Sequence, residues 1–155
     1  MMKDTYQQAQ QFLNDIFGHV GLDLHAEALE NENGCTLNLD GADSAFLRSE
    51  GGELLDALEH FINQSFAHGL PEGERFVCDV HSFRAMRETE LQAMAQHAAD
   101  RVRSTGVPFI FGPMSAGERR VIHLTLARDD DLFTESVGES NARRLKVSLK
   151  TLAKN

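Results

Sequence analysis

The first half of the chain carries two kinds of hydrophobic pattern. In two segments apolar residues recur every three or four positions, which is typical of a helix with one buried face. In three others apolar residues alternate with polar ones or form a short run, which favours strands. In order, the pattern predicts a helix over residues 4–18, strands over 22–28 and 35–40, a helix over 53–68 and a strand over 75–80.

Turn residues predict where these elements begin and end. Asn33-Gly34 between the first two strands is a strong signal for a β-hairpin. Gly18 or Gly21 is expected to end the first helix, because glycine readily adopts the left-handed conformation that follows many helices. A single helical turn over residues 43–47 and a loop over residues 48–52 are expected before the second helix.

The second half of the chain predicts two helices and three strands. A long helix over residues 84–104 ends before Gly106 and Pro108. A shorter helix is expected over 116–127, and strands over 107–111, 133–137 and 144–149. The long helix should turn inward Met86, Leu91, Met94, Ala98 and Val102. The predicted fold class is α/β (α+β), with one domain over residues 1–81 and a second over 82–155.

The composition excludes several classes of protein. The 155 residues suffice for one compact domain or two small ones. No apolar run approaches the roughly 18 residues of a membrane-spanning helix, and no signal peptide is apparent, so we expect a cytoplasmic protein without membrane insertion. Cys35 and Cys78 lie too far apart for a zinc or redox motif, and the histidines form no ligand cluster. We therefore expect reduced thiols and neither a metal nor a cofactor.

Charge is distributed unevenly along the chain. The net charge of −9 argues at first against nucleic-acid binding. Residues 1–70, however, hold two basic and twelve acidic side chains, whereas residues 71–155 hold thirteen basic and twelve acidic ones. The first part is thus strongly acidic and the second nearly neutral, with acids gathered at residues 129–131. Any site for an anion such as phosphate is expected in the second part.

The segment over residues 112–123 predicts the start of a helix. Ser115 followed by Glu118 is a capping box, in which each side chain binds a backbone N–H group of the first turn. The helix is therefore expected to begin near Ala116. A helix N-terminus carries a partial positive charge, so this one should attract anions.

Three side chains of this helix are candidates for binding an anion. At about 100° per residue, Arg119, Arg120 and His123 share one side of the helix. A guanidinium binds two phosphate oxygens at once, and an imidazole donates a hydrogen bond and becomes charged in mildly acidic solution. Alternatively this is an ordinary solvated surface, on which Arg120 forms a salt bridge with Glu118 or with the acidic run.

Four further arginines extend the candidate site. Arg84 and Arg87 lie three residues apart at a helix start, where the helix dipole disfavours cations. An external anion would compensate that cost, and so would a carboxylate from elsewhere in the fold. Arg143 and Arg144 alternate in direction, so only one of them can join the patch, and we favour Arg143.

These motifs occur in an order that resembles a known pair of domains. The segments over 83–88, 105–106, 119–123 and 134–144 resemble the R-three-H domain, a module that binds single-stranded nucleic acid. The residues before them resemble a type II KH domain. The tandem is similar to the C-terminal part of the bacterial Jag (SpoIIIJ-associated) family of RNA-binding proteins. The resemblance implies a KH-like domain over 1–81 and an R-three-H domain over 82–155.

The resemblance also implies which residues bind. The family's paired arginine and histidine correspond to Arg119 and His123, and its other basic positions to Arg84, Arg87 and Arg143. Arg120 adds charge on the same side. The nucleic-acid-binding set is thus Arg119, His123, Arg120, Arg84, Arg87 and Arg143.

The chain departs from the KH pattern at the loop that normally carries Gly-x-x-Gly. Arg48 occupies the first glycine position, Ser49 and Glu50 follow, and only Gly51 remains. The two family glycines allow close approach of the nucleic-acid backbone, which a side chain obstructs and a carboxylate repels. We therefore expect the loop to contribute little to binding, and the domain to serve packing or protein contacts.

Two functions follow as alternatives. The first is non-catalytic binding of single-stranded RNA or DNA, with weak sequence preference because Phe83 and Phe111, the available stacking candidates, are expected in the core. The second is a protein-interaction adaptor, in which the acidic half binds another KH protein or itself. No nucleophile, metal or paired-carboxylate motif is present, so an enzyme is not expected.

Overall fold

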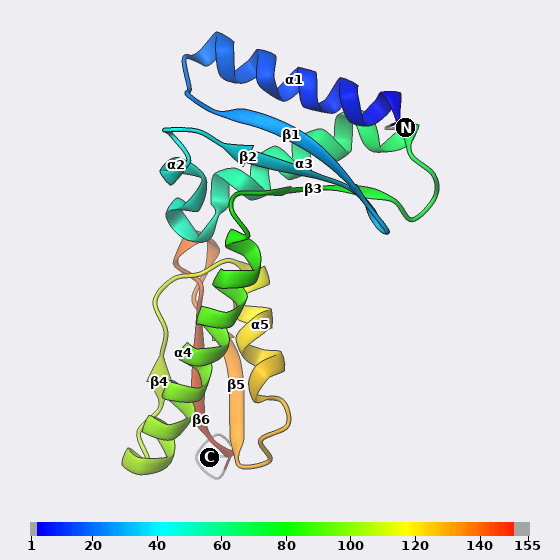
Figure 1. Ribbon diagram of the computed structural model, residues 1–155. Helices are drawn as coiled ribbons and strands as arrows, with labels where there is room; N and C mark the ends of the chain where they lie inside the picture. The colour runs from blue at the N-terminus through cyan, green and yellow to red at the C-terminus, as the bar shows by residue number, and fades with distance from the viewer. Residues whose placement is uncertain (1–2, 151–155) are drawn as a thin grey trace. The chain divides into compact units, whose positions relative to one another are not determined.

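The chain divides into two compact units between Arg84 and Ala85. A computed structural model describes residues 3–150 (Figure 1). The first part contains α1 (Asp4–Val20), β1 (His25–Asn31), β2 (Gly34–Asp40), α2 (Ala45–Arg48), η1 (Ser49–Gly51), α3 (Glu53–Phe66), η2 (Ala67–Gly69) and β3 (Arg75–Asp79). The second part begins within α4 (Phe83–Thr105) and contains β4 (Phe109–Ile110), α5 (Ala116–Leu126), β5 (Leu132–Val137), η3 (Ser140–Ala142) and β6 (Arg144–Leu149). The predicted mixed α/β class is confirmed.

In the first unit, three strands form one sheet in the order β1-β2-β3. β1 runs antiparallel to β2, and β2 runs parallel to β3. Helix α1 packs on β1 and α3 on β3, so the inward side chains of all three strands are covered (Figure 1). Tyr6 of α1 meets Phe76 of β3 edge to face, with 5.9 Å between ring centroids. This is the α-β-β-α-β order that the hydrophobic pattern predicts.

The hairpin between β1 and β2 lies one residue earlier than predicted. Asn31 pairs with Gly34, so the loop consists of residues 32–33 and Gly34 begins β2. The cause lies in the neighbouring strand. Gly34 has φ of 129°, and a Cβ there would come within 2.2 Å of the Arg75 carbonyl oxygen. Glycine is needed at this position for the approach of β3, which the turn signal alone does not reveal.

Some residues with core spacing are exposed. Leu54 and Phe61 of α3 are 39% and 49% exposed, because Leu55 and Ile62 take the positions that face the sheet. Met86, expected to face inward, is 67% exposed in the first turn of α4, where the core of the second unit has not yet begun. Helix α1 ends at Val20, and the left-handed residue that follows it is Gly21.

The second unit is a three-stranded antiparallel sheet in the order β4-β6-β5. Its core joins α4, α5 and the strands through Leu91, Ala95, Ala98, Ala99, Val102, Phe111, Ile122, Leu126, Leu132, Leu145 and Val147. Arg103 of α4 binds Asp131 through two hydrogen bonds of 2.8 Å, which holds the acidic run against the helix. Within residues 3–150, no helix combines the length and apolar character needed to cross a membrane.

The outer edge of β1 is covered by side chains of α1. The Asn14 amide accepts from the Ala26 N–H (2.7 Å) and donates to the Ala26 carbonyl (3.1 Å). The Gln10 amide accepts from the Ala28 N–H (2.8 Å). These bonds replace those that a further strand would make, so the covered part of β1 is not available to pair with another strand.

The outer edge of β3 is covered in the same way by α3. The Asn63 amide bonds both the N–H (2.9 Å) and the carbonyl (2.8 Å) of Phe76. The Glu59 carboxylate accepts from the Cys78 N–H (2.9 Å), and Arg84 donates to the Cys78 carbonyl (2.8 Å). Side chains thus bond backbone groups along both long edges of the first sheet.

Both cysteine thiols are buried and reduced. Cys35 and Cys78 are 1% and 0% exposed and form no disulfide. Burial raises the pKa of Cys35 to about 11 and that of Cys78 to about 12. A thiol that is neutral at pH 7 and inaccessible is a poor nucleophile.

We expect Asn63→Ala to lower the free energy of unfolding by about 2 kcal/mol, because it leaves the Phe76 N–H and carbonyl without partners. Urea denaturation followed by circular dichroism measures this. The matched control is Gln11→Ala, since that amide makes one exposed bond to Asp15 (2.8 Å) and its loss should cost under about 0.5 kcal/mol. Equal effects of the two substitutions would show that covering the β3 edge does not stabilise the fold.

We expect neither thiol to react with iodoacetamide in the folded protein at pH 7.5, and both to react at once in denaturant. Alkylation followed by mass spectrometry measures the rate. Because the thiolate forms only when the core opens, the rate should follow the unfolding equilibrium as denaturant is added. Rapid alkylation of the native chain would contradict the burial of these side chains.

Candidate functional site

Helix α5 begins at Ala116, as the sequence predicts, and one of the two hydrogen bonds of the expected capping box forms. Ser115 is the N-cap, and its hydroxyl accepts from the Glu118 N–H at 3.2 Å. The Glu118 carboxylate does not accept a hydrogen bond from the Ser115 N–H. It binds the Arg87 guanidinium at 2.7 Å instead, and this links the first turn of α5 to α4.

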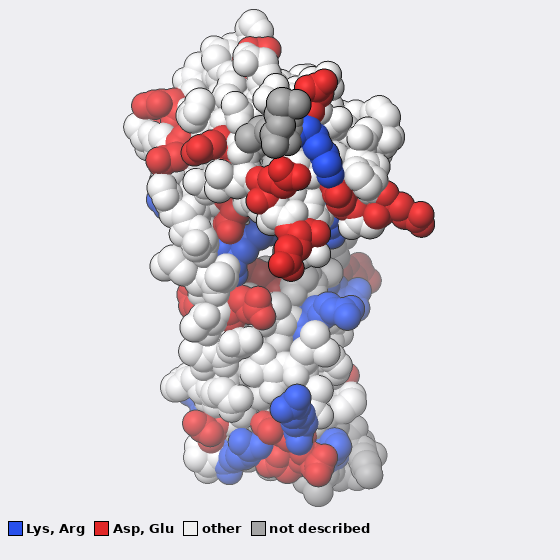
Figure 2. Space-filling view, turned by 45° about the vertical axis from the view of Figure 1, so that its right-hand side comes forward, with Lys and Arg blue, Asp and Glu red and all other residues white. Residues whose placement is uncertain are grey.

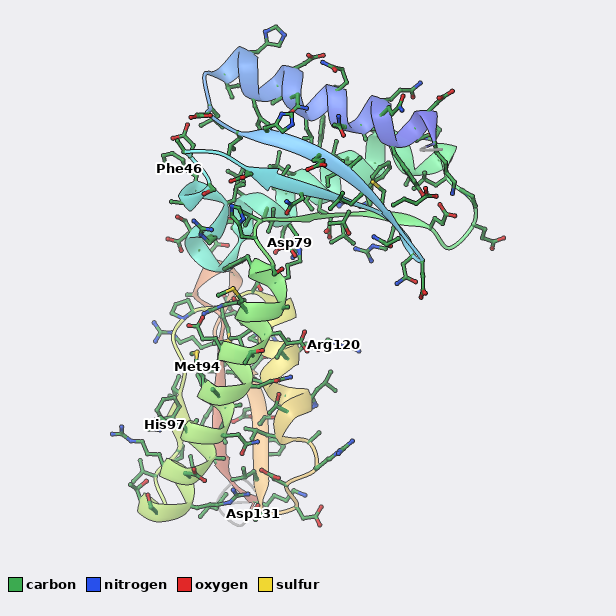
Figure 3. All side chains as sticks on the ribbon, in the orientation of Figure 1. Phe46, Asp79, Met94, His97, Arg120 and Asp131 are labelled. Atoms are coloured by element: carbon green, nitrogen blue, oxygen red, sulfur yellow. The ribbon has the colours of Figure 1, made fainter. Side chains whose placement is uncertain are left out.

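The helix turns its cationic side away from the core, as predicted. Ile122 and Leu126 are buried, whereas Arg120 and His123 are exposed. Figure 3 labels Arg120, whose side chain extends from α5 into solvent. Arg119 is half-buried and donates to the Met114 carbonyl at 2.6 Å, which anchors the segment that leads into the helix.

His123 connects the helix to the sheet. Its Nδ1 shares a hydrogen bond of 2.5 Å with the Thr134 hydroxyl of β5. The remaining ring nitrogen, Nε2, makes no hydrogen bond within the described part of the chain. The bond to Thr134 orients the imidazole, so Nε2 is held ready to bind a ligand.

A hollow of about 470 Å³ lies between α5 and β5. Both Arg119 and Arg120 border it, together with His123. The complete lining is Ala116, Gly117, Arg119, Arg120, His123, Thr134, Glu135, Ser136 and Leu145. Ala116 and Gly117 of the helix are small, which leaves room for a ligand above Leu145. The two arginines and His123 lie at the border of this space.

The cations of the hollow are free of carboxylate partners. Among residues 3–150, no carboxylate lies within ion-pair distance of Arg119 or Arg120. Glu135 is the one acid in the lining, and it approaches Lys146 at 3.8 Å. Figure 2 shows acidic side chains gathered over the first unit, and most of the visible arginines and lysines over the second.

Arg143 and Arg144 diverge as the sequence predicts. Arg144 begins β6, and Arg143 precedes it in extended conformation. Side chains alternate along such a segment, so Arg143 shares the side of Leu145, which lines the hollow, and Arg144 lies on the opposite face of the sheet. Arg143 is exposed, although it is not part of the lining itself.

Arg84 and Arg87, which the sequence predicts to bind nucleic acid, are both paired with carboxylates. Arg84 lies in the first unit and pairs with Asp56 (2.8 Å) and Glu59 (3.3 Å). Arg87 pairs with Glu118 and with Glu90 (3.0 Å). The hydrogen bond to Glu118 raises the pKa of the Arg87 guanidinium. Carboxylates from distant segments therefore compensate both cations, which is the alternative that the sequence left open.

The loop between α2 and α3, where KH domains carry Gly-x-x-Gly, contains three consecutive residues in the left-handed conformation. Glu50, Gly51 and Gly52 all have positive φ, of 53°, 66° and 87°. A left-handed conformation is unfavourable for Glu50, since it has a Cβ. Arg48 donates to the Ser44 hydroxyl at 3.3 Å. The loop thus has no pair of glycines around a basic centre.

Sequence reasoning missed the strand side of the hollow. Thr134, Ser136 and Leu145 carry no charge, and only their place opposite α5 makes them part of the site. The two stacking candidates are core residues: Phe111 is 4% exposed, and Phe83 packs on the first core. In the described part of the chain, no group of three His, Cys, Asp or Glu side chains could hold a metal ion.

Comparison with known proteins identifies relatives of both halves. Residues 89–149 match the R-three-H domain family. The RNA-binding protein KhpB of Clostridium symbiosum is 30% identical over 151 residues, which is 96% of this chain and 68% of that protein. KhpB of Bacillus subtilis is 27% identical over 95% of this chain and 72% of its own length, and KhpB of Lactiplantibacillus plantarum is 29% identical over 74% and 36%. The chain belongs to the KhpB family, the Jag family that its motifs resemble.

Proposed function

We propose that this protein binds single-stranded nucleic acid, RNA above all, through the hollow between α5 and β5. Arg119, Arg120 and His123 bind backbone phosphates there, and Arg143 extends the positive surface. The binding is proposed to be non-catalytic: among the described residues, the hollow holds a single carboxylate, Glu135, and no group of side chains that could hold a metal ion. The names of the KhpB relatives and the R-three-H match support RNA as the ligand.

One observation carries the proposal. The cations at the hollow have no carboxylate partners within the described residues, whereas Arg84, Arg87 and Arg103 all have them. Arg84 and Arg87 are half-buried and neutralised by carboxylates, whereas half-buried Arg119 and exposed Arg120 are not, so the positive charge of the hollow stays available for an external anion. Phosphate suits the site because a guanidinium binds two of its oxygens together.

The first unit is proposed to be a KH-like domain whose loop does not grip nucleic acid. Its Glu50 would stand beside a phosphate, and Gly51 alone remains of the expected pair. Its net acidity adds repulsion. Association of this unit with another KH protein or with itself, and location in the cytoplasm, stay predictions.

We expect Arg120→Ala/His123→Ala to weaken binding of a labelled single-stranded RNA at least tenfold, because two charge-assisted contacts are lost. Fluorescence anisotropy measures the affinity. With about three phosphates neutralised, binding of the wild-type chain should weaken roughly 20-fold between 50 and 200 mM salt.

The matched control is Arg101→Ala, which removes an exposed arginine of α4 outside the hollow and should change affinity less than twofold. Arg48→Ala tests the loop of the first unit and should also have little effect. Binding that is independent of salt, or that both hollow and control variants weaken equally, would contradict the proposed site.

A further inference from the structure

The edges of the two sheets are treated differently. In the first unit both long edges are covered by side-chain amides and carboxylates. In the second, β4 is only two residues long, but β5 is a six-residue strand at the edge of its sheet. Within residues 3–150, no side chain bonds the backbone of β5. The edge of β5 is thus uncovered among the described residues, and residues of the same strand line the cationic hollow.

The hydrogen bonds of the sheet show toward which neighbouring strand each residue directs its backbone N–H and C=O groups. The Phe111 N–H donates to the Leu145 carbonyl at 3.0 Å, so the backbone groups of Leu145 are directed toward β4. Direction alternates along a strand, and Lys146 is therefore directed toward β5, where it pairs with Glu135. The backbone N–H and C=O of Glu135 are therefore hydrogen-bonded to β6.

It follows that Thr134 and Ser136, on either side of Glu135, direct their backbone N–H and C=O groups away from β6. The bond from the Lys150 N–H to the Asp131 carbonyl (3.0 Å) agrees with this phase. No described residue between 3 and 150 supplies a partner on that side. Two donors and two acceptors thus lie about 6.6 Å apart along the free edge, two residues of strand rise.

The two residues that carry these free groups also line the hollow. Thr134 and Ser136 are both part of its lining, facing Arg120 and His123 on the helix. A phosphate on the helix side would place the attached nucleotide between α5 and the strand edge. A base in that position meets alternating donors and acceptors, which is the pattern that base edges themselves present.

We infer that the free edge of β5 reads unpaired bases: the backbone groups of Thr134 and Ser136 hydrogen-bond the Watson–Crick edges of nucleotides whose phosphates lie on Arg120 and His123. The inference rests on the proposed function and deepens it. It explains a requirement for single strands, because the base edges that the strand uses are the ones occupied in a duplex. It also supplies base contacts that do not need aromatic side chains.

A protein strand added to the same edge is the competing occupant, and the surroundings favour nucleic acid. A pairing strand would satisfy Thr134 and Ser136 but would bring no anion to Arg120 and His123. A nucleotide satisfies both sides of the hollow at once. The described edge also exposes only these two outward-directed residues plus Leu132, whose N–H already donates to Asp129 (3.1 Å).

The first test observes the wild-type chain by amide hydrogen exchange in ¹H–¹⁵N NMR. In the free protein the Thr134 and Ser136 amides should exchange quickly, and that of Glu135 slowly. A single-stranded RNA should protect the two fast amides at least tenfold. An abasic oligonucleotide and inorganic phosphate should shift the Arg120 and His123 signals without protecting the strand amides.

The second test uses proline as a probe of a single N–H group. Ser136→Pro removes the outward N–H while leaving the ladder to β6 intact, and edge strands tolerate proline in this orientation. It should weaken RNA binding about 3- to 10-fold, the loss expected for one hydrogen bond. The comparison variant Ser136→Ala removes the hydroxyl but keeps the N–H, so Ser136→Pro should bind RNA more weakly than Ser136→Ala by that factor.

The outcomes separate this inference from the proposed function. Binding that depends on Arg120 and His123, but leaves the strand amides unprotected, overturns the inference alone. Protection that appears with protein concentration in the absence of RNA assigns the edge to a protein strand and also overturns it. Failure of the chain to bind any oligonucleotide overturns both.

Discussion

The fold of the first unit depends on the need to pair backbone polar groups along the edges of its sheet. In the first unit, side chains of the packed helices meet this need: Asn14 and Gln10 along β1, Asn63 and Glu59 along β3. The helices are therefore fixed in register to the strands as well as packed against them. The same constraint gives Arg84 its structural position, since it bonds the Cys78 carbonyl and the carboxylates beside it.

In the second unit, the same principle of compensation separates structural cations from available ones. Arg87 and Arg103 join α4 to α5 and to the acidic run through carboxylates. Burial of Ile122 and Leu126 then turns Arg120 and His123 outward, and the bond from His123 to Thr134 positions the imidazole over the sheet. The hollow is a consequence of this arrangement, because the core positions the helix and small residues near its start leave space beside β5.

The distribution of charge explains how an acidic chain can carry an anion site. Most of the excess negative charge belongs to residues 1–70. Interactions between exposed charges fade beyond about 10 Å at 0.1 M salt, so the charges nearest the hollow decide its attraction for an anion. Six of the twelve acids in residues 71–155 form ion pairs, among them Glu118 with Arg87 and Asp131 with Arg103. Net charge is thus a poor guide to the field at a single site.

The sequence by itself determined the elements and the composition of one side of the site. Helical periodicity, the Ser115 cap and the 100° step were enough to predict α5 and the side on which Arg120 and His123 lie, because these depend on neighbours within a few residues. Only the tertiary structure decided the rest. Arg84 and Arg87 meet carboxylates 28 and 31 residues away, Gly34 is required by a strand far along the chain, and the strand side of the hollow exists only where β5 comes beside α5. Such contacts join residues that no local pattern connects, so their partners are specified by packing of the whole unit.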